Sequence, residues 1–193
     1  MNHSNIILGC VADDFTGASD AASFLRAAGL RVIMCTGIPE TAEQISDCDA
    51  VVIALKCRST PSAEAVRETA GAFNWLHSVG AKQLYYKYCS TFDSTREGNI
   101  GPVMDAALAE TGEKYTVLCP ALPVNGRTVR NGRLFVDGVP LHLTHMKDHP
   151  VNLKRIERGL RPANSIWFWG EGVRKELTPF AEKYGKSAAM ISA

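Results

Sequence analysis

Two adjacent carboxylates, Asp13 and Asp14, directly follow an apolar run near the start of the chain. That run, 6–12, contains no charged residue, as is typical of a strand buried on both faces of a parallel sheet. Thr16 and Gly17 come next, where a helix should begin. Asp14 or Thr16 can cap this helix, and Gly17 lets a ligand approach the backbone closely. Either one Asp caps while the other is solvated, or the pair binds a cation or a ligand hydroxyl.

Three further loops carry cations, carboxylates and hydroxyls of the kinds that a small, anionic, hydroxylated molecule needs. Arg can hold a carboxylate through two parallel hydrogen bonds, and Asp accepts hydrogen bonds from sugar hydroxyls. Each loop follows an apolar, strand-like run. The residues are Lys56, Arg58 and Ser59; Ser90, Thr91, Asp93 and Ser94; and Asn125 and Arg127.

Each of these groups also has an ordinary structural explanation. Lys56 and Arg58 can be solvated surface charges, and the hydroxyls of 90–95 can cap the helix that follows. Asn125 and Gly126 are typical of a turn. We nevertheless expect a site, because the carboxyl ends of parallel strands share one edge of the sheet, where open α/β sheets bind ligands.

The elements that must position these residues alternate between strands and helices, which predicts an α/β fold with a doubly wound parallel sheet. We expect strands at 6–12, 31–36, 50–55, 83–88 and 115–119, and helices at 17–28, from Thr60 to Gly80, and at 99–110, with a short helix near 40–45. Beyond Cys119, two Gly-containing turns separate short β runs at 128–130, 134–136 and 139–143. These turns predict a small β-hairpin excursion over about 127–143.

Composition narrows the class of protein. The chain has 193 residues, 46% of them hydrophobic, and a formal net charge of +1, so we expect neither nucleic acid nor an anionic membrane as a partner. Six cysteines occur without a C-x-x-C pair, which favours free thiols in a reducing compartment. The start of the chain has no basic leader, and no apolar run approaches the ~20 residues of a membrane span. The sequence therefore predicts a cytoplasmic domain.

Several common catalytic motifs are absent. Neither G-x-x-x-x-G-K-[ST] nor G-x-G-x-x-G occurs, so no usual phosphate-binding loop is expected. Ser90 lacks the flanking glycines of a nucleophile elbow. His142 and His145 are three residues apart without an acidic or Cys partner pattern, so we expect no metal site.

Four segments, in this order along the chain, resemble the N-terminal half of the four-carbon acid sugar kinases: 12–18, 54–59, 87–101 and 119–128. The resemblance covers about 5–152 and is strongest to the 3-oxo-tetronate kinase branch. It implies ATP-dependent phosphorylation of a terminal hydroxyl on a four-carbon sugar acid. It further implies that the N-terminal domain holds the sugar acid, while a separate C-terminal domain, not expected in this chain, holds ATP with Mg²⁺.

The same resemblance implies roles for individual residues. Asp13 and Asp14 would be catalytic, facing the sugar hydroxyls, with one of them as general base. Arg58, with Lys56 nearby, would hold the carboxylate of the sugar acid. The other implied substrate-binding residues are Thr16, Gly17, Ser59, Lys87, Ser90, Asp93, Ser94, Asn125, Gly126 and Arg127.

From Arg155 onward the sequence is similar instead to a segment of the archaeal-type cofactor-independent phosphoglycerate mutases. We therefore expect a chimera joined at about 148–152, with 1–152 as the sugar-acid-binding domain and 153–193 as a C-terminal extension that is not an independent domain. The extension lacks the Asp and His metal set that mutase chemistry requires. The run 166–169 predicts a buried strand, so the extension would serve packing or association.

Three functions remain open from the sequence. The first is a kinase fragment that needs a nucleotide domain, which a partner chain would supply; a homo-oligomer is the other association that we consider. The second is a non-catalytic binding module for a small anionic, hydroxylated metabolite. The third is a mutase-like phosphotransfer enzyme, against which the missing metal ligands count. Product formation from a sugar acid and Mg-ATP would separate the first from the second, and metal-dependent turnover of phosphoglycerate would favour the third.

Overall fold

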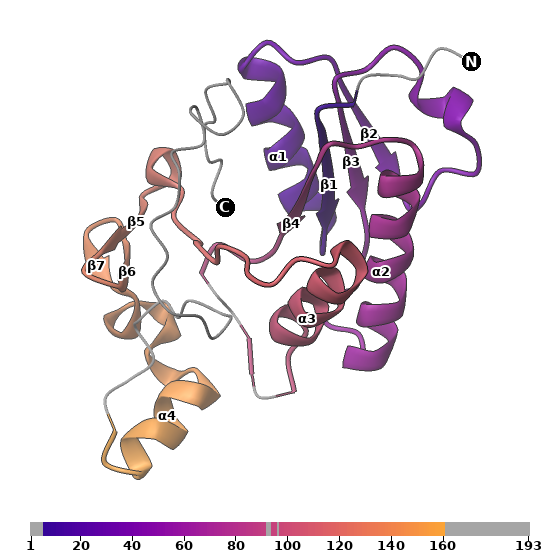
Figure 1. The fold of residues 1–193 in the computed structure, drawn as a ribbon. Coiled ribbons are helices and arrows are strands. Elements are labelled where there is room, and N and C mark those ends of the chain that lie inside the picture. The colour runs from indigo at the N-terminus through magenta and orange to yellow at the C-terminus, as the bar shows by residue number, and fades with distance from the viewer. Residues whose placement is uncertain (1–5, 92–93, 96, 161–193) are drawn as a thin grey trace.

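A parallel four-stranded sheet forms the centre of the computed structural model, which describes residues 6–91, 94–95 and 97–160 (Figure 1). The strand order is β2-β3-β1-β4. Ala12, the last residue of β1, lies opposite Ala54 in β3 and Lys87 in β4. The three strands therefore end level with one another, and the loops that follow them start from one edge. The strands are β1 (Leu8–Ala12), β2 (Val32–Thr36), β3 (Ala50–Ala54) and β4 (Gln83–Lys87).

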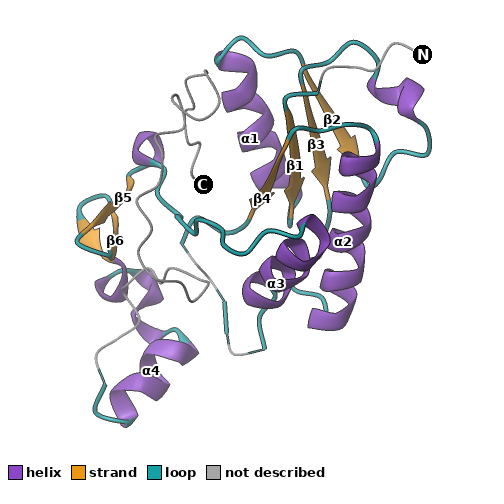
Figure 2. Ribbon diagram, viewed as in Figure 1, coloured by secondary structure: helices purple, strands orange, loops and turns teal. Residues whose placement is uncertain are grey.

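Helices cover both faces of this sheet, which confirms the doubly wound α/β prediction (Figures 1 and 2). Under α1 (Phe15–Ala27), Ala18 and Leu25 pack against apolar side chains of β1 and β3. On the other face, Phe73 and Leu76 of α2 (Ser62–Ser78) pack against the opposite side of the same two strands. The third helix, α3 (Ile100–Thr111), packs beside α2. Burial on both faces explains the unbroken apolar sequence of β1 and β3.

Gly9 in the middle of β1 is explained by the close packing of α2. A Cβ atom at Gly9 would lie 3.0 Å from both methyl groups of Leu76. The absence of a side chain therefore lets α2 approach the sheet.

The predicted fifth strand at 115–119 is wrong. These residues have no strand pairing, and Tyr115 and Val117 are exposed. Leu118 is buried against Tyr88 and α3, which places the segment beside the end of β4. The apolar composition predicted a strand, but burial of an apolar side chain does not require a hydrogen-bonded ladder.

The β-hairpin excursion is confirmed as a small antiparallel sheet of β5 (Arg127–Arg130), β6 (Arg133–Val136) and β7 (Val139–Pro140). Asn131 and Asp137, in the two turns, have positive φ, as do the glycines that follow them. The third run is shorter than expected, because Pro140 has no N–H for a ladder. Short 3₁₀ helices cover Ala42–Ile45, Pro123–Asn125, Leu141–Leu143 and His145–Asp148, and α4 covers Pro150–Glu157.

The remaining expectations concern the cysteines, membrane helices and the tail. All six cysteines are free of disulfides. Within 6–91, 94–95 and 97–160, no helix has both the length and the apolar character needed to cross a membrane. The strand predicted at 166–169 lies outside the described residues.

Candidate functional site

Asp14 forms the start of α1 and lies at the carboxyl end of β1. Its backbone is extended, and its Oδ1 accepts a hydrogen bond of 2.8 Å from the N–H of Gly17. This is the N-cap arrangement expected of an Asp ahead of a helix. A Cβ atom at Gly17 would lie 2.6 Å from that same oxygen and 3.2 Å from Nζ of Lys87. The capping contact and the neighbouring lysine therefore explain a glycine at position 17.

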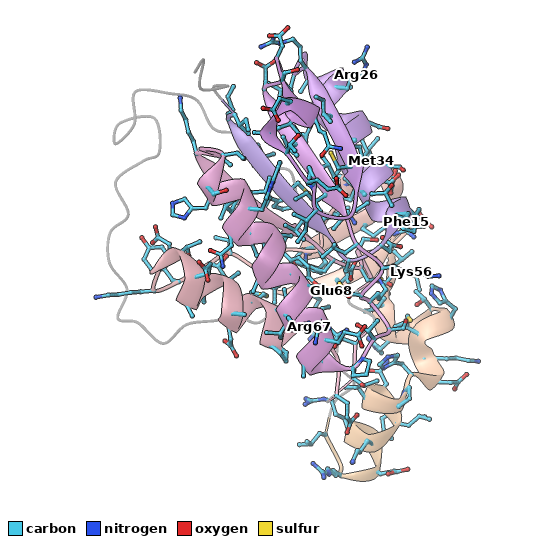
Figure 3. All side chains as sticks on the ribbon, turned by 90° about the vertical axis from the view of Figure 1, so that its right-hand side faces the viewer. Phe15, Arg26, Met34, Lys56, Arg67 and Glu68 are labelled. Atoms are coloured by element: carbon cyan, nitrogen blue, oxygen red, sulfur yellow. The ribbon has the colours of Figure 1, made fainter. Side chains whose placement is uncertain are left out.

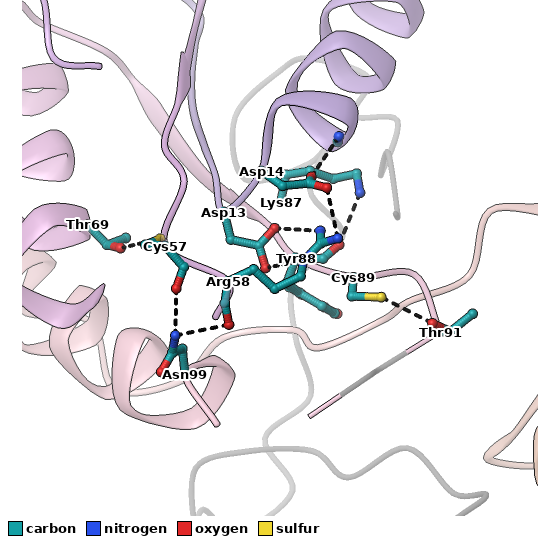
Figure 4. A network of polar contacts seen from close by, with 11 residues as sticks. Asp13, Asp14, Cys57, Arg58, Thr69, Lys87, Tyr88, Cys89, Thr91 and Asn99 are labelled. Atoms are coloured by element: carbon teal, nitrogen blue, oxygen red, sulfur yellow. Dashed lines mark hydrogen bonds and ion pairs between the residues drawn. The ribbon is translucent and has the colours of Figure 1, made fainter. Parts of the chain in front are cut away.

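Arg58, on the loop after β3, joins the two carboxylates (Figure 4). Its Nε and Nη2 contact the two oxygens of Asp13 at 3.1 and 2.7 Å, a two-pronged pairing. Its Nη1 contacts Oδ2 of Asp14 at 2.8 Å. Bidentate pairs of this kind fix geometry as well as adding energy. The three side chains thus form one charged cluster, which we call the Asp13–Arg58–Asp14 cluster.

The main chain of Asp13 connects three strand ends. Its N–H donates to the carbonyl of Lys87 at 3.1 Å, and its carbonyl accepts from the N–H groups of Cys57 and Arg58 at 3.1 and 3.2 Å. The loops after β1, β3 and β4 are therefore held together by peptide groups. This explains why residues 45 positions apart meet in the cluster.

Burial sets the electrostatics of the cluster. The side chain of Asp13 is 3% exposed, that of Arg58 33% and that of Asp14 27%. Burial raises the pKa of Asp13 above its usual range, although the hydrogen bond and charge of Arg58 oppose the rise. Burial would lower the pKa of Arg58, but the hydrogen bonds to Asp13 and the negative charges of Asp13 and Asp14 together outweigh burial, and the pKa is raised. Arg58 therefore favours the ionised form of Asp13, which burial alone disfavours.

Lys87 brings a second cation to this place. It is buried at the end of β4, and its Nζ donates to the carbonyl of Tyr88 at 3.0 Å (Figure 4). Its charge, like that of Arg58, limits the rise in the pKa of Asp13 that burial causes. The site therefore holds two carboxylates and two cations.

A cavity of about 220 Å³ opens beside the cluster. One wall is made by Asp13, Arg58 and the loop after β3, and the other by the segment that leads into α3. Hydroxyl groups prevail among the polar side chains of its lining: Asp13, Arg58, Ser59, Thr60, Ser94, Thr95, Glu97, Gly98, Asn99 and Ile100.

The structure brings together much of the predicted site. Asp13, Arg58, Ser59 and Ser94 line the cavity; Asp14, Gly17 and Lys87 contact or adjoin the cluster.

Other predicted residues of this edge are less directly placed. Lys56 is exposed on the loop after β3 (Figure 3), Thr16 is exposed in the first turn of α1, and Ser90 is half-buried after β4. Asp93 lies outside the described residues.

The third predicted group, Asn125, Gly126 and Arg127, lies where the small sheet begins. Arg127 donates from Nη1 to the carbonyl of Asn125. The carbonyl of Gly126, which has positive φ, accepts from the N–H of Asp137 at 2.8 Å. In Figure 1 the small sheet lies to one side of the main sheet, and the two hydrogen bonds just described lie within the segment 125–137 rather than at the Asp13–Arg58–Asp14 cluster.

Asn99 is the residue that the sequence interpretation did not single out. Its Nδ2 donates to the carbonyls of Cys57, Arg58 and Thr60 at 2.6, 3.2 and 3.1 Å. In the sequence, an Asn just before a helix predicts only a cap. No sequence pattern indicates that its amide instead binds a loop about 40 residues earlier.

The carboxylates are not arranged as metal ligands. All four carboxylate oxygens of Asp13 and Asp14 already contact Arg58 or the N–H of Gly17. Across the described part of the chain, no group of three His, Cys, Asp or Glu side chains is placed to hold a metal ion. The described residues therefore do not fit a Mg²⁺ site.

A parallel α/β sheet with charged loops and a hydroxyl-lined cavity at its carboxyl edge places the chain among the open-sheet α/β domains, in which ligands bind at that edge. Comparison with known families makes this specific. The family described as the sugar-binding N-terminal domain matches residues 8–153, and the chain belongs to this family.

Curated relatives of the chain are 3-oxo-tetronate kinases. The one from Brucella melitensis is 57% identical over 145 residues, which cover 75% of this chain and 33% of the relative. The one from Methylobacterium radiotolerans is 52% identical over 202 residues, covering 98% of this chain and 47% of the relative. The chain thus spans about a third to a half of the length of these relatives.

Solved structures agree with the fold. A Haemophilus influenzae protein is 50% identical with a TM-score of 0.69, over 79% of this chain and 38% of that one. A Bordetella bronchiseptica protein is 33% identical with a TM-score of 0.64, over 75% of this chain and 36% of that one. The Bordetella protein was crystallised as a domain-swapped dimer with bound citrate.

The expected chimera is not supported. The match to the Methylobacterium kinase covers 98% of this chain, and that to a Pseudomonas savastanoi 3-oxo-tetronate kinase covers 100% of it at 43% identity. The residues after 152 therefore align with the same kinases as the residues before them. The similarity to a mutase segment rested on a short stretch, which is weak support for a separate origin.

Proposed function

We propose that this chain is the sugar-acid-binding part of an ATP-dependent kinase that phosphorylates a four-carbon, 3-oxo-tetronate-like acid. The observation that carries the proposal is the Asp13–Arg58–Asp14 cluster beside a hydroxyl-lined cavity. Membership of the sugar-binding family and similarity to 3-oxo-tetronate kinases support the same substrate class.

The cavity offers partners for both ends of such an acid. Carboxylate and hydroxyl oxygens of Asp13, Ser59 and Ser94 accept hydrogen bonds from substrate hydroxyls. The guanidinium of Arg58 has five N–H groups, and three of its nitrogens contact Asp13 and Asp14. Its remaining N–H groups, with the ammonium of Lys87 nearby, suit the carboxylate of the substrate.

One of the two aspartates accepts the proton of the substrate hydroxyl. ATP, when bound, supplies the phosphoryl group. As the substrate hydroxyl oxygen forms its bond to phosphorus, its proton passes to Asp13 or Asp14, and the bond from phosphorus to the departing ADP oxygen breaks. Asp13 lines the cavity, and burial raises its pKa above the ordinary value, so its carboxylate is a stronger base than that of an ordinary exposed aspartate. Phosphoryl transfer otherwise depends on alignment and charge neutralisation, which Arg58 and Lys87 supply.

A non-catalytic binding module is the second candidate function. It is favoured by the state of the carboxylates, because every oxygen of Asp13 and Asp14 already contacts a donor. A general base must give up or share one of these contacts, whereas a binding site need not.

We further propose that 1–152 is the binding unit, that 153–193 extends it without forming an independent domain, and that the nucleotide site lies in the part of the relatives that this chain does not match. Six cysteines without disulfides support a cytoplasmic location. The domain-swapped dimer of the Bordetella relative supports a homo-oligomer.

Calorimetry with a 3-oxo-tetronate tests binding. Asp13→Asn and Asp14→Asn should each weaken binding about tenfold or more, because each removes a charged acceptor and disturbs Arg58. Asp20→Asn, on the same helix α1, is the matched control and should bind like the unaltered chain. Equal affinity in all four proteins would exclude the cluster from the binding site.

Turnover separates the two candidates. The Methylobacterium relative aligns with this chain over 47% of its length, so the chain can replace that part of the relative. The hybrid should phosphorylate a 3-oxo-tetronate with Mg-ATP, and its Asp13→Asn variant should lose most of that rate. A hybrid that binds both ligands but forms no product would favour the binding module.

A further inference from the structure

Asn99 connects α3 to the loop that carries Arg58. Its side chain is buried, and Nδ2 lies within hydrogen-bond distance of three carbonyl oxygens, those of Cys57, Arg58 and Thr60. An amide has two N–H groups, so at least one of them is shared between carbonyls. All three acceptors belong to a single segment of four residues. The amide therefore fixes the path of that segment.

The same residue does not perform its usual task at a helix start. Asn99 is the N-cap of α3, yet its side chain makes no capping hydrogen bond. Its carbonyl still accepts from the N–H of Val103 and begins the helix. The helix itself is held by Ile100, Val103 and Met104, which are buried. The amide thus acts on the loop rather than on the helix.

The loop held in this way is the one that forms the charged cluster. The main-chain carbonyl of Arg58 accepts from Asn99, its N–H donates to the carbonyl of Asp13, and its guanidinium contacts both aspartates. Arg58 is thereby fixed at its backbone from two sides (Figure 4). Asn99 also lines the cavity beside the cluster.

We propose that Asn99 is a positioning residue for sugar-acid binding, acting through Arg58: it holds the 57–60 segment so that the guanidinium spans Asp13 and Asp14. This inference rests on the proposed function for its effect on the substrate, but the positioning itself does not need a ligand. Without the amide, the 57–60 segment keeps its two bonds to Asp13 but loses three on the side of α3. The guanidinium then spends less time on the carboxylates.

The test compares Asn99→Ala with Asn152→Ala. Asn152 is the matched control, because it is also a buried Asn whose Nδ2 donates to a backbone carbonyl, that of Met146 at 2.8 Å. Thermal unfolding measures the general cost of each change. Carbon NMR of the labelled Asp13 carboxyl, without ligand, follows its titration, and calorimetry follows binding of a 3-oxo-tetronate.

In Asn99→Ala the pKa of Asp13 should be higher than in the unaltered chain, because Arg58 opposes the effect of burial less. Binding of the 3-oxo-tetronate should weaken about tenfold. Asn99→Ser retains one donor, so its Asp13 pKa and its affinity should lie between those of Asn99→Ala and those of the unaltered chain. This variant keeps the test decisive if Asn99→Ala does not fold. Asn152→Ala should lose stability while the Asp13 titration and the affinity stay unchanged.

The positioning role is wrong if Asp13 titrates alike in Asn99→Ala, Asn99→Ser and the unaltered chain. It is equally wrong if Asn152→Ala shifts the titration as much, because the effect would then be general loosening. If neither the unaltered chain nor any of these variants binds a 3-oxo-tetronate, the proposed function fails. The titration of Asp13 without ligand then still decides whether Asn99 positions Arg58.

Discussion

Replacing Arg58 with Met would leave the buried carboxylate of Asp13 without its two-pronged partner. The change removes the charge and keeps a side chain of similar length. Breaking a fully buried pair costs about 3–5 kcal/mol. Asp13 is 3% exposed, but Arg58 is 33% exposed, so water reaches the pair and the expected cost is smaller. We expect Arg58→Met to lose about 2 kcal/mol of unfolding free energy near neutral pH.

The loss should depend on pH. Burial already raises the pKa of Asp13 above its ordinary 3.8, and Arg58 limits that rise. Without Arg58 the folded-state pKa rises further. For an acid whose folded pKa is raised, stability falls as pH increases from the ordinary value through the folded value. The gap between Arg58→Met and the unaltered chain should therefore be largest at about pH 7 and narrow as pH falls to about 4.

Urea unfolding at several pH values measures this gap. The double variant Asp13→Asn with Arg58→Met removes both charges, so it should be more stable at neutral pH than Arg58→Met alone. Arg31→Met is the control, because Arg31 pairs with Asp47 and Asp49 at an exposed place, and it should cost much less. A gap that stays constant with pH, or a double variant no more stable than Arg58→Met, would refute this account of the cluster.

Three further substitutions test other parts of the structure. Gly17→Ala should lower the free energy of unfolding by about 1 kcal/mol despite the helix preference of Ala, because its Cβ meets the capping oxygen of Asp14. Gly101→Ala in α3, with open space around it, is the control and should not destabilise the chain. A Gly17→Ala variant more stable than the unaltered chain would contradict the capping contact. Gly9→Ala should cost about 1–3 kcal/mol in thermal unfolding, since its Cβ would crowd α2, and an unchanged midpoint would show that α2 adapts. Tyr86→Phe should be neutral or stabilising by up to about 1 kcal/mol, because the buried hydroxyl has no hydrogen-bond partner among the described residues, and a clear loss would reveal a partner.

The two central strands, β1 and β3, were predictable because burial on both faces demands unbroken apolar runs, and such runs stand out in the sequence. That Asp13 and Arg58 would lie close together could also be predicted, because parallel strands end at one edge of the sheet and each of these residues follows a strand. The direct pairing of Arg58 with Asp13 and Asp14 did not follow, because spacing along the chain says nothing of which charges touch. For the same reason Asn99 was missed.

The error in the predicted strands has a physical cause. Residues 115–119 have a strand-like composition, but only Leu118 is buried with the end of β4, and composition does not reveal whether a ladder forms. Asn125 and Arg127 follow an apolar run and were therefore predicted to join the site. The turn at Gly126 is bonded to Asp137 of the small sheet, and the place of these residues in the binding site stays a prediction.

The peptide groups of Asp13 bind the loops on both sides of β1. These bonds use main-chain atoms alone, so they survive any side-chain replacement that leaves the backbone in place. The backbone of the site is thus positioned by the sheet, whereas its charge and hydrogen-bonding groups come from a few side chains that can be replaced. Such a division lets a protein acquire a preference for a different acid without rebuilding the fold that presents it.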